Sequence, residues 1–480
     1  MTNENRTRWL ALYVLCLGDL MIVLDATIVN VALPTIRDDL GFSQASLAWV
    51  VNAYLLTFGG FLLLGGRLGD LFGHRRLFLA GIALFTLASL ACGLATTQGT
   101  LVAARAVQGL GGAVVSAVAL SLLMTLFTEP ADRAKAMGFF GFVLSGGGTA
   151  GVLLGGVLTD LLSWHWIFLV NLPVGIAVFL LGLRLLPADR GERQRGRLDL
   201  GGAVLVTGAL MLAVYAIVNG NEIGWGTART LGLLGASLAL FTGFLVLETR
   251  IASPLVPLRV FRSRDLTTAN VVAVLMAGGM FAQFFLSALY LQQILGYSPL
   301  EVGLAYAPST VVWGAASLFL SDRLVMRFGI KPPLVGGLAV MALGVLLFAR
   351  APVDGSFAVD VLPASLLIGL GAGVAFNPLL LAAMSGVAPT ESGLASGLVN
   401  TSFMMGGALG LAVLASIAAA RTDALGDSLE AVNGGYHAAF LVAGVFVLVS
   451  VVLAALLLKA SAVPAMEHGP EAVPEPEPAG

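Results

Sequence analysis

Charged residues are scarce in this chain. Of its 480 residues only 11% are Asp, Glu, Lys or Arg, whereas 58% are hydrophobic, and the mean hydropathy is +0.95. A water-soluble domain carries about 25% charged residues. A long chain with so few charges cannot cover a surface that faces water, so its solvent must be the lipid bilayer.

Other residue types and motifs are also scarce or missing, and this excludes several classes of protein. Two cysteines cannot build a disulfide framework, and four histidines leave no cluster with the spacing of metal ligands. The string GxxxxGK followed by Ser or Thr, which marks an ATP-binding loop, does not occur. The net charge of −2 gives no attraction to nucleic acid. We therefore expect no cofactor, no metal and no enzymatic activity; a membrane enzyme or a receptor is the disfavoured alternative.

What the sequence does contain is long apolar runs. A helix needs about 20 apolar residues to cross the hydrocarbon core. Runs this uniform exclude barrel strands, in which polar and apolar residues alternate. The sequence predicts an all-α polytopic membrane protein with fourteen transmembrane helices, over 9–33, 46–65, 77–96, 100–122, 136–160, 165–186, 199–218, 230–247, 267–291, 302–320, 334–350, 358–381, 393–419 and 437–458.

Basic residues indicate the orientation. If both termini are cytoplasmic, 20 of the 25 Lys and Arg fall in cytoplasmic segments, four fall in outer segments and one, Arg105, lies inside a helix. Lys and Arg concentrate on the cytoplasmic side of membrane proteins. We therefore expect a multi-pass protein of the cytoplasmic membrane with cytoplasmic N- and C-termini.

Two pairs of similar short segments predict an internal repeat. GRLGDLFGHRR (66–76) aligns with RLVMRFGIK (323–331) at an offset of 323 − 67 = 256, and QGLGGA (108–113) resembles IGLGAG (368–373) at an offset of 260. Two parallel six-helix halves around a midplane site form the architecture of an alternating-access carrier. Since one chain supplies both halves, it should function as a monomer. The expected parts are an N-terminal half over 1–190, a linker with two inserted helices over 191–264, a C-terminal half over 265–460 and a disordered tail over 461–480.

Three ionisable residues, Asp19, Asp25 and Arg105, lie inside predicted helices and away from the helix ends. At 1.5 Å per residue, Asp25 lies about 12 Å and Arg105 about 8 Å below the same outer face, so the two can pair if their helices are neighbours. Water access and a nearby guanidinium both control whether a buried carboxylate holds a proton. We predict proton coupling for these three residues. A purely structural ion pair is the alternative, and for Asp19 a hydrogen bond to a neighbouring helix.

Six blocks follow one another along the chain: LDATIVNVALP (24–34), GRLGDLFGHRR (66–76), LVAARAVQGLGGA (101–113), WHWIFLVNLPVG (164–175), YLQQILGYSPLEVGL (290–304) and GLASGLVNTS (393–402). Together they resemble the fourteen-helix drug:proton antiporters of the major facilitator superfamily (EmrB/QacA type) over nearly the whole chain. The resemblance implies export of lipophilic compounds driven by the proton gradient. It assigns Asp25 and Arg105 to proton coupling and the segment 66–76 to gating of the inner face.

The segment 66–76 has a physical reading of its own. Asp70 could dock on the positive N-terminal end of the helix over 393–419, and such a contact contributes only about 0.3–1 kcal/mol, so it is a reversible latch. Glycines allow tight turns and close helix approach. The positive-inside rule alone is the alternative explanation of the basic residues. The predicted gating residues are Gly66, Arg67, Gly69, Asp70, Gly73 and Arg75.

The helix over 136–160 is rich in glycine. Where the related antiporters carry Gly-Pro, this chain has Gly151 followed by Val152, so the helix keeps close packing without a proline kink. The predicted hinge consists of Gly147, Gly151, Gly155 and Gly156.

The second half has no buried charge, which favours neutral, aromatic or singly charged lipophilic substrates: drugs, antibiotics or related natural products. A carrier for a specific nutrient or metabolite is the alternative. The expected partners are this substrate, protons and membrane lipid. Interhelical hydrogen bonds and ordinary apolar packing are the alternatives for the candidate pocket residues, which are Asn30, Asn52, Gln108, Phe281, Phe285 and Met404.

Overall fold

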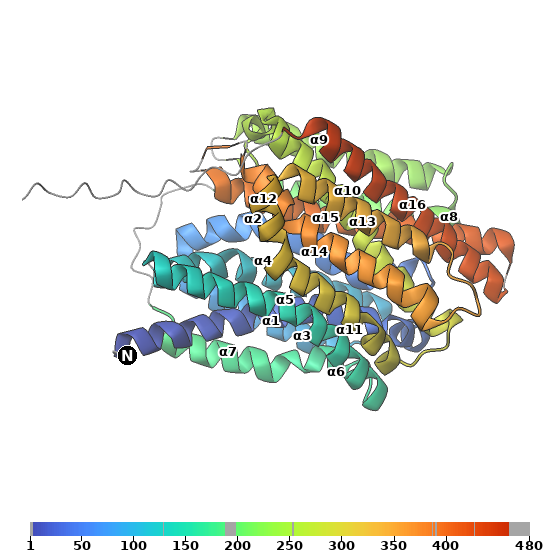
Figure 1. The fold of residues 1–480 in the computed structure, drawn as a ribbon, viewed down its shortest axis with the longest axis horizontal. Helices are drawn as coiled ribbons and strands as arrows, with labels where there is room; N and C mark the ends of the chain where they lie inside the picture. Colours follow the sequence, from blue (N-terminus) through green and yellow to red (C-terminus); the bar gives the residue numbers. More distant parts are fainter. Residues whose placement is uncertain are drawn as a thin grey trace, which may run out of the picture.

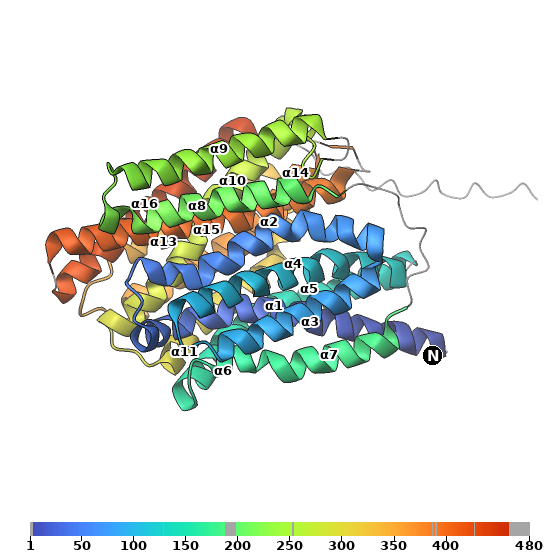
Figure 2. The ribbon, with the colours of Figure 1, turned by 180° about the vertical axis from the view of Figure 1, so that it is seen from behind.

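The computed structural model describes residues 3–127, 129–187, 198–251, 254–385, 387–388, 391–426 and 428–459. The described residues form a bundle of long helices that run along one common direction (Figures 1 and 2). The predicted tail over 461–480 lies outside this part of the chain. We call the end of the bundle where the first helix begins the near end, and the opposite end the far end.

The first half of the chain supplies six long helical segments. They are α1 (Asn3–Leu40), α2 (Trp49–Phe72), α3 (His74–Gly93), α4 (Gln98–Leu126), α5 (Pro130–Leu161) and the broken pair α6 (Trp166–Leu169) and α7 (Asn171–Leu185). Two further helices, α8 (Leu200–Ile223) and α9 (Ala228–Arg250), form a hairpin before the second half.

The second half again supplies six. They are α10 (Arg264–Leu289) with a π-helical extension (Tyr290–Ile294), α11 (Pro299–Ala315) continued by a π-helical segment (Ala316–Ser321) and α12 (Asp322–Phe328), α13 (Lys331–Phe348), α14 (Leu362–Ser385) preceded by a π-helical segment (Phe357–Val361), α15 (Ser392–Leu425) and α16 (Leu429–Leu457). Short 3₁₀ turns precede α2 and α10 at Ser46–Ala48 and Leu258–Arg262.

Thirteen of the described helical segments are long and apolar enough to cross a membrane. The remaining helix of that length is α5, with 32 residues, some of whose side chains lie outside the described part. The prediction of an all-helical chain with fourteen spans is confirmed.

Close contacts between glycines and backbone show that the two halves repeat one packing unit. A Cβ on Gly111 of α4 would lie 2.7 Å from Phe85 N on α3, and a Cβ on Gly371 of α14 would lie 2.4 Å from Met341 N on α13. The offsets are 371 − 111 = 260 and 341 − 85 = 256, which equal the offsets between the two pairs of similar segments in the sequence. Glycine is needed at both crossings because a side chain there would collide with backbone.

The halves meet along two seams. On one side α5 packs against α11, where a Cβ on Gly156 would lie 2.7 Å from Pro299 O and one on Gly303 would lie 2.8 Å from Val152 O. Both contacts are near the far end, where Gln292 also donates a hydrogen bond to Val31 O at 2.8 Å. The far end is therefore closed between the halves.

On the other side α2 packs against α15, and α8 lies over this second seam (Figure 2). A Cβ on Gly60 of α2 would lie 1.9 Å from Thr207 Oγ1 of α8, and Asn221 of α8 donates to Ser416 O of α15 at 2.8 Å. The inserted hairpin thus touches both halves, through α8.

The segment 66–76, which lies between the helices predicted over 46–65 and 77–96, is mostly helical. It is the last two turns of α2, a tight turn at Gly73 (φ 98°) and the start of α3. Gly329, its partner in the repeat, has φ 80° and joins α12 to α13 in the same way. Apolar residues between the glycines keep α2 helical, so only the residue with positive φ breaks the helix.

Candidate functional site

The two opposite charges predicted to share a depth form a buried ion pair. Arg105 Nη1 donates to Asp25 Oδ2, and both residues are 0% exposed. Asp25 comes from the middle of α1 and Arg105 from the first third of α4. An ion pair this deep stays charged only if further hydrogen bonds satisfy both partners.

Those hydrogen bonds come from α4 itself and from two more helices, α7 and α2. Asp25 Oδ1 accepts from Gln108 Nε2 at 2.7 Å and from Asn171 Nδ2 at 3.1 Å. Arg105 Nε donates to Val50 O of α2 at 3.0 Å, and the guanidinium lies 4.4 Å above the ring centre of Tyr54. The carboxylate is thus held by three donors and the guanidinium by carboxylate, carbonyl and ring.

Ser89 of α3 closes the network. Its hydroxyl lies 2.7 Å from Gln108 Nε2 and 3.0 Å from Asn171 Nδ2, and accepts from both. Gln108 Oε1 in turn accepts from Arg105 Nη1 at 2.7 Å. Arg105 is the one cation that pairs with Asp25 in the described part of this network. A proton that binds the carboxylate removes the counter-charge of Arg105, and thereby affects the hydrogen bonds that join five helices.

Local sequence explains why these side chains converge. Arg105 and Gln108 are three residues apart and therefore share one face of α4. Gly109 lets α2 approach that face, since a Cβ there would lie 2.5 Å from Tyr54 O. α7 begins at Asn171 after a break at Val170, which directs the Asn171 amide toward α1 and α3.

Asp19 lies apart from the pair. It is 4% exposed and accepts a hydrogen bond from Ser116 of α4 at 2.8 Å. Its other oxygen, Oδ2, has no hydrogen-bond partner among the described residues. Asp19 therefore bonds to a neighbouring helix and keeps one open acceptor; its part in proton coupling stays a prediction.

The predicted pocket residues do not gather in one place. Gln108 belongs to the ion-pair network, and Asn30 bonds only within α1, to Ala26 O and Thr27 O. Asn52 is 0% exposed, and neither polar atom of its side chain has a partner in the described part of the chain.

The apolar candidates are also separated. Phe285 is fully buried in the core. Phe281 and Met404 lie elsewhere: Phe281 packs on Phe403 and Gly407, and Met404 meets Gly59 across the α2–α15 seam.

The predicted hinge glycines are contact points along a continuous α5. Gly147, Gly151 and Gly155 face α1, where a Cβ on Gly155 would lie 2.7 Å from Ile28 O. Gly156 faces α11 of the other half. Their role as a hinge stays a prediction.

Some of the predicted gating residues contact neighbouring residues, and others are exposed. Gly69 packs on His74 and Val118, Arg75 donates to Leu183 O, and Asp70 pairs with His74 at 3.5 Å. A Cβ on Gly66 would meet nothing within 4 Å, and Arg67 is exposed.

Sequence reasoning missed Ser89, Asn171 and Tyr54. Asn171 stands in the block WHWIFLVNLPVG, but a neutral amide carries no charge that would mark it as unusual inside a membrane. A polar residue directly before an apolar helix was the available signal, and it fits an ordinary helix start equally well.

An all-helical chain of fourteen spans, built from two repeated six-helix halves with a buried ion pair in one of them, is a membrane transporter of the alternating-access type. The sequence profile of the Major Facilitator Superfamily matches residues 15–411. The chain belongs to this superfamily.

Two similar proteins cover almost the whole chain. One is the puromycin resistance protein pur8 of Streptomyces alboniger, 40% identical over 476 residues, which are 97% of this chain and 94% of the relative. Another is the cephamycin export protein CmcT of Amycolatopsis lactamdurans, 40% identical over 458 residues, 95% of this chain and 94% of the relative. The tetracenomycin C resistance and export protein of Streptomyces glaucescens is 36% identical and spans 86% of this chain and 76% of its own.

A solved structure has the same fold. It is a bacterial homologue of the human lysosomal transporter Spinster, in an inward-facing, unoccupied conformation; the match has a TM-score of 0.66, is 17% identical, and covers 96% of this chain and 99% of that one.

Proposed function

We propose that the protein is a proton-coupled secondary transporter that exports lipophilic antibiotics, drugs or related natural products across the cytoplasmic membrane. The observation that carries the proposal is the Asp25–Arg105 pair, the charge network buried among five helices of the first half. The names of the relatives, which refer to puromycin, cephamycin and tetracenomycin C, support the substrate class.

We propose further that both termini are cytoplasmic and that one chain is the functional unit. The near end of the bundle carries most of the Lys and Arg, as the cytoplasmic side does in membrane proteins. Two repeated halves in one chain supply both walls of an alternating-access path. With this orientation, the closed far end is the outer gate, and opening it requires breaking the Gln292–Val31 hydrogen bond.

The experiment is transport in liposomes. Purified protein in liposomes with an acidic interior should take up puromycin and proflavine, because inside-out molecules exchange internal protons for external drug. Uptake should stop when a protonophore collapses the gradient. Uptake that persists after the collapse contradicts proton coupling, and failure to move any compound of a wider antibiotic panel contradicts the exporter in favour of a specific nutrient carrier.

The segment 66–76 is proposed to latch the near end in the outward-open state. Asp70 is 44% exposed and pairs with His74 in the present conformation, so it is free to exchange partners. Asp70→Asn should lower the turnover rate by a few-fold, the effect of losing a contact of about 0.3–1 kcal/mol, and leave drug binding unchanged. His74→Ala, which removes the present partner of Asp70 together with the packing of His74 near Gly69, is the comparison. Equal turnover of Asp70→Asn and wild type would count against the latch.

A further inference from the structure

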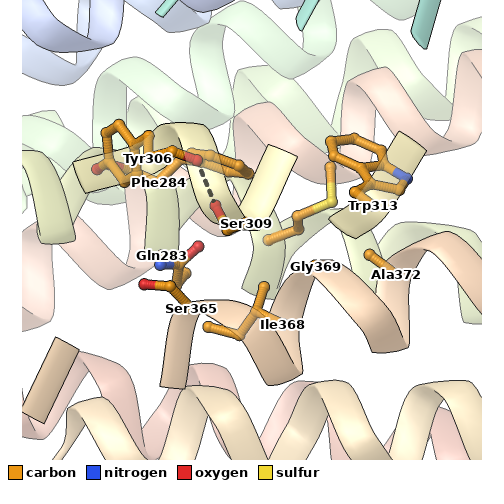
Figure 3. Close-up of a pocket in the computed structure, with 10 residues that line it drawn as sticks. Gln283, Phe284, Tyr306, Ser309, Trp313, Ser365, Ile368, Gly369 and Ala372 are labelled. Carbon is orange, nitrogen blue, oxygen red and sulfur yellow. Dashed lines mark hydrogen bonds between the residues drawn. The ribbon is translucent and has the colours of Figure 1, made fainter. Parts of the chain in front are cut away.

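A small recess lies within the second half, away from the ion pair. It is enclosed by α10, α11 and α14 and is lined on its polar side by Gln283, Tyr306 and Ser365 and on its apolar side by Met280, Phe284 and Trp313. Figure 3 shows Gln283 and Ser365 together at one side of the recess and Trp313 at the other. The proposed function uses none of these residues.

Two polar atoms in the recess are buried without partners. Gln283 is 2% exposed and Ser365 is 3% exposed, and neither Gln283 Oε1 nor Ser365 Oγ has a hydrogen-bond partner among the described residues. An unsatisfied buried polar atom costs about 1–3 kcal/mol. Two of them side by side in one hollow indicate a place where a bound group completes the hydrogen bonding.

The other polar groups of the recess are already engaged. Tyr306 Oη lies 2.7 Å from both Phe284 O and Ser287 Oγ, and Ser309 donates to Tyr306 O at 2.8 Å. Gln283 Nε2 donates to Ser287 Oγ at 3.2 Å, which directs its Oε1 away from that bond. Among the described residues, the hydrogen-bonding groups left over are the amide oxygen of Gln283, which only accepts, the second N–H of its amide, and the hydroxyl of Ser365.

The floor of the recess is rigid and its apolar wall is adaptable. A Cβ on Gly369 would lie 2.3 Å from Ser309 O, and one on Gly373 would lie 2.5 Å from Trp313 O, so α11 and α14 touch backbone to backbone. Opposite them, the aromatic rings of Phe284 and Trp313 and the flexible thioether of Met280 can rearrange around a flat apolar group.

The three helices of the recess share one further property. Each is continuous with a π-helical segment: Tyr290–Ile294 after α10, Ala316–Ser321 after α11 and Phe357–Val361 before α14. Within the described ranges no other helix carries one. Such segments are rare and occur frequently at functional sites.

We propose that this recess is a recognition subsite for the exported compound, and that it selects a hydrogen-bond donor, an N–H or O–H, attached to a planar aromatic body. Gln283 Oε1 accepts from that donor, Ser365 Oγ supplies a second hydrogen bond, and Trp313 and Phe284 contact the ring system. The proposal deepens the proposed function and rests on it for the direction of transport.

Two dyes that share one acridine ring system but differ in their amino groups test the subsite. Proflavine is a planar acridine with two amino groups, and acridine orange is the same ring system with every amino hydrogen replaced by methyl. Equilibrium binding to the full chain in lipid nanodiscs, followed by dye anisotropy without a pH gradient, should give a Kd about ten-fold lower for proflavine. In the double variant Gln283→Leu, Ser365→Ala this preference should vanish while acridine orange binding stays.

Matched variants separate the loss of donor recognition from general damage to the protein. Gln283→Glu keeps an acceptor and should keep the preference, and Ser365→Ala alone, which removes one oxygen atom, should weaken it by a few-fold. Ser450→Ala on α16, whose hydroxyl bonds only to Phe446 O of its own helix, should change nothing. Equal affinity of wild type for the two dyes, or no binding of proflavine, overturns the subsite. So does a preference that survives in the double variant. Because binding needs no gradient, this result is independent of the liposome experiment. If the protein exports drugs but shows no preference for proflavine, only the subsite proposal is contradicted.

Discussion

Replacement of Asp25 by Asn should reduce proton-driven uptake in liposomes to the level of liposomes without protein. The amide has the shape of the carboxylate and can still accept from Gln108 and Asn171, so the geometry of the site is kept, although Arg105 is left as an uncompensated buried charge and the stability falls. The amide can neither carry the charge that compensates Arg105 nor bind and release a proton. Equilibrium binding of puromycin to the variant should persist, which would separate loss of coupling from loss of the site.

The matched control is Asp38→Asn. Asp38 lies on the same helix, α1, but its side chain is 67% exposed and pairs only with its neighbour Arg37. Exposed pairs contribute about 0–1 kcal/mol, so this variant should transport normally. Accumulation of drug against a gradient by Asp25→Asn would remove Asp25 from the coupling mechanism and leave the ion pair with a structural role.

Arg105→Ala should abolish transport and also destabilise the protein. It leaves Asp25 as an uncompensated buried charge, and breaking a buried pair in this way costs about 3–5 kcal/mol. Arg105→Lys should keep part of the activity, because an ammonium can pair with Asp25 but cannot match the guanidinium, which bonds to Asp25, Gln108 and Val50 O at once. Thermal unfolding in detergent and liposome uptake measure the two effects.

The double variant Asp25→Asn, Arg105→Ala distinguishes structure from coupling. It removes both charges, so thermal stability should recover toward that of wild type while transport stays absent. Arg37→Ala, which removes the partly exposed partner of Asp38, is the control for loss of an arginine. Normal transport by Arg105→Ala would contradict the assignment, and recovery of transport together with stability in the double variant would reduce the pair to a structural lock.

The sequence was most informative where charge is rare. In a chain with so few ionisable residues inside its helices, the depths of Asp25 and Arg105 were enough to predict that they can pair if their helices are neighbours, and the structure pairs them. The number of helices followed from run lengths, and the repeat followed from glycines whose positions are dictated by helix crossings. Each of these signals lies along the chain and needs no knowledge of how the helices are arranged.

Features that depend on the arrangement were missed. Ser89 and Asn171 are ordinary polar residues until five helices bring them to one carboxylate. Of the candidate pocket residues on α10, Phe285 is buried in the core, whereas its neighbour Phe284, about 100° away on the helix, lines the recess. Gln283 and Ser365 are single polar residues on two helices far apart in the sequence, and only the fold places them together.

The inserted hairpin makes the two sides of the transporter unequal toward the lipid. α8 covers the α2–α15 seam, whereas the described contacts at the α5–α11 seam are those of the two halves themselves, with Gly156 and Gly303 bringing the backbones together toward the far end. A lipophilic compound dissolved in the bilayer therefore meets a covered seam on one side of the transporter and a seam between the halves alone on the other. If cargo enters from the membrane, we expect it to enter on the α5–α11 side.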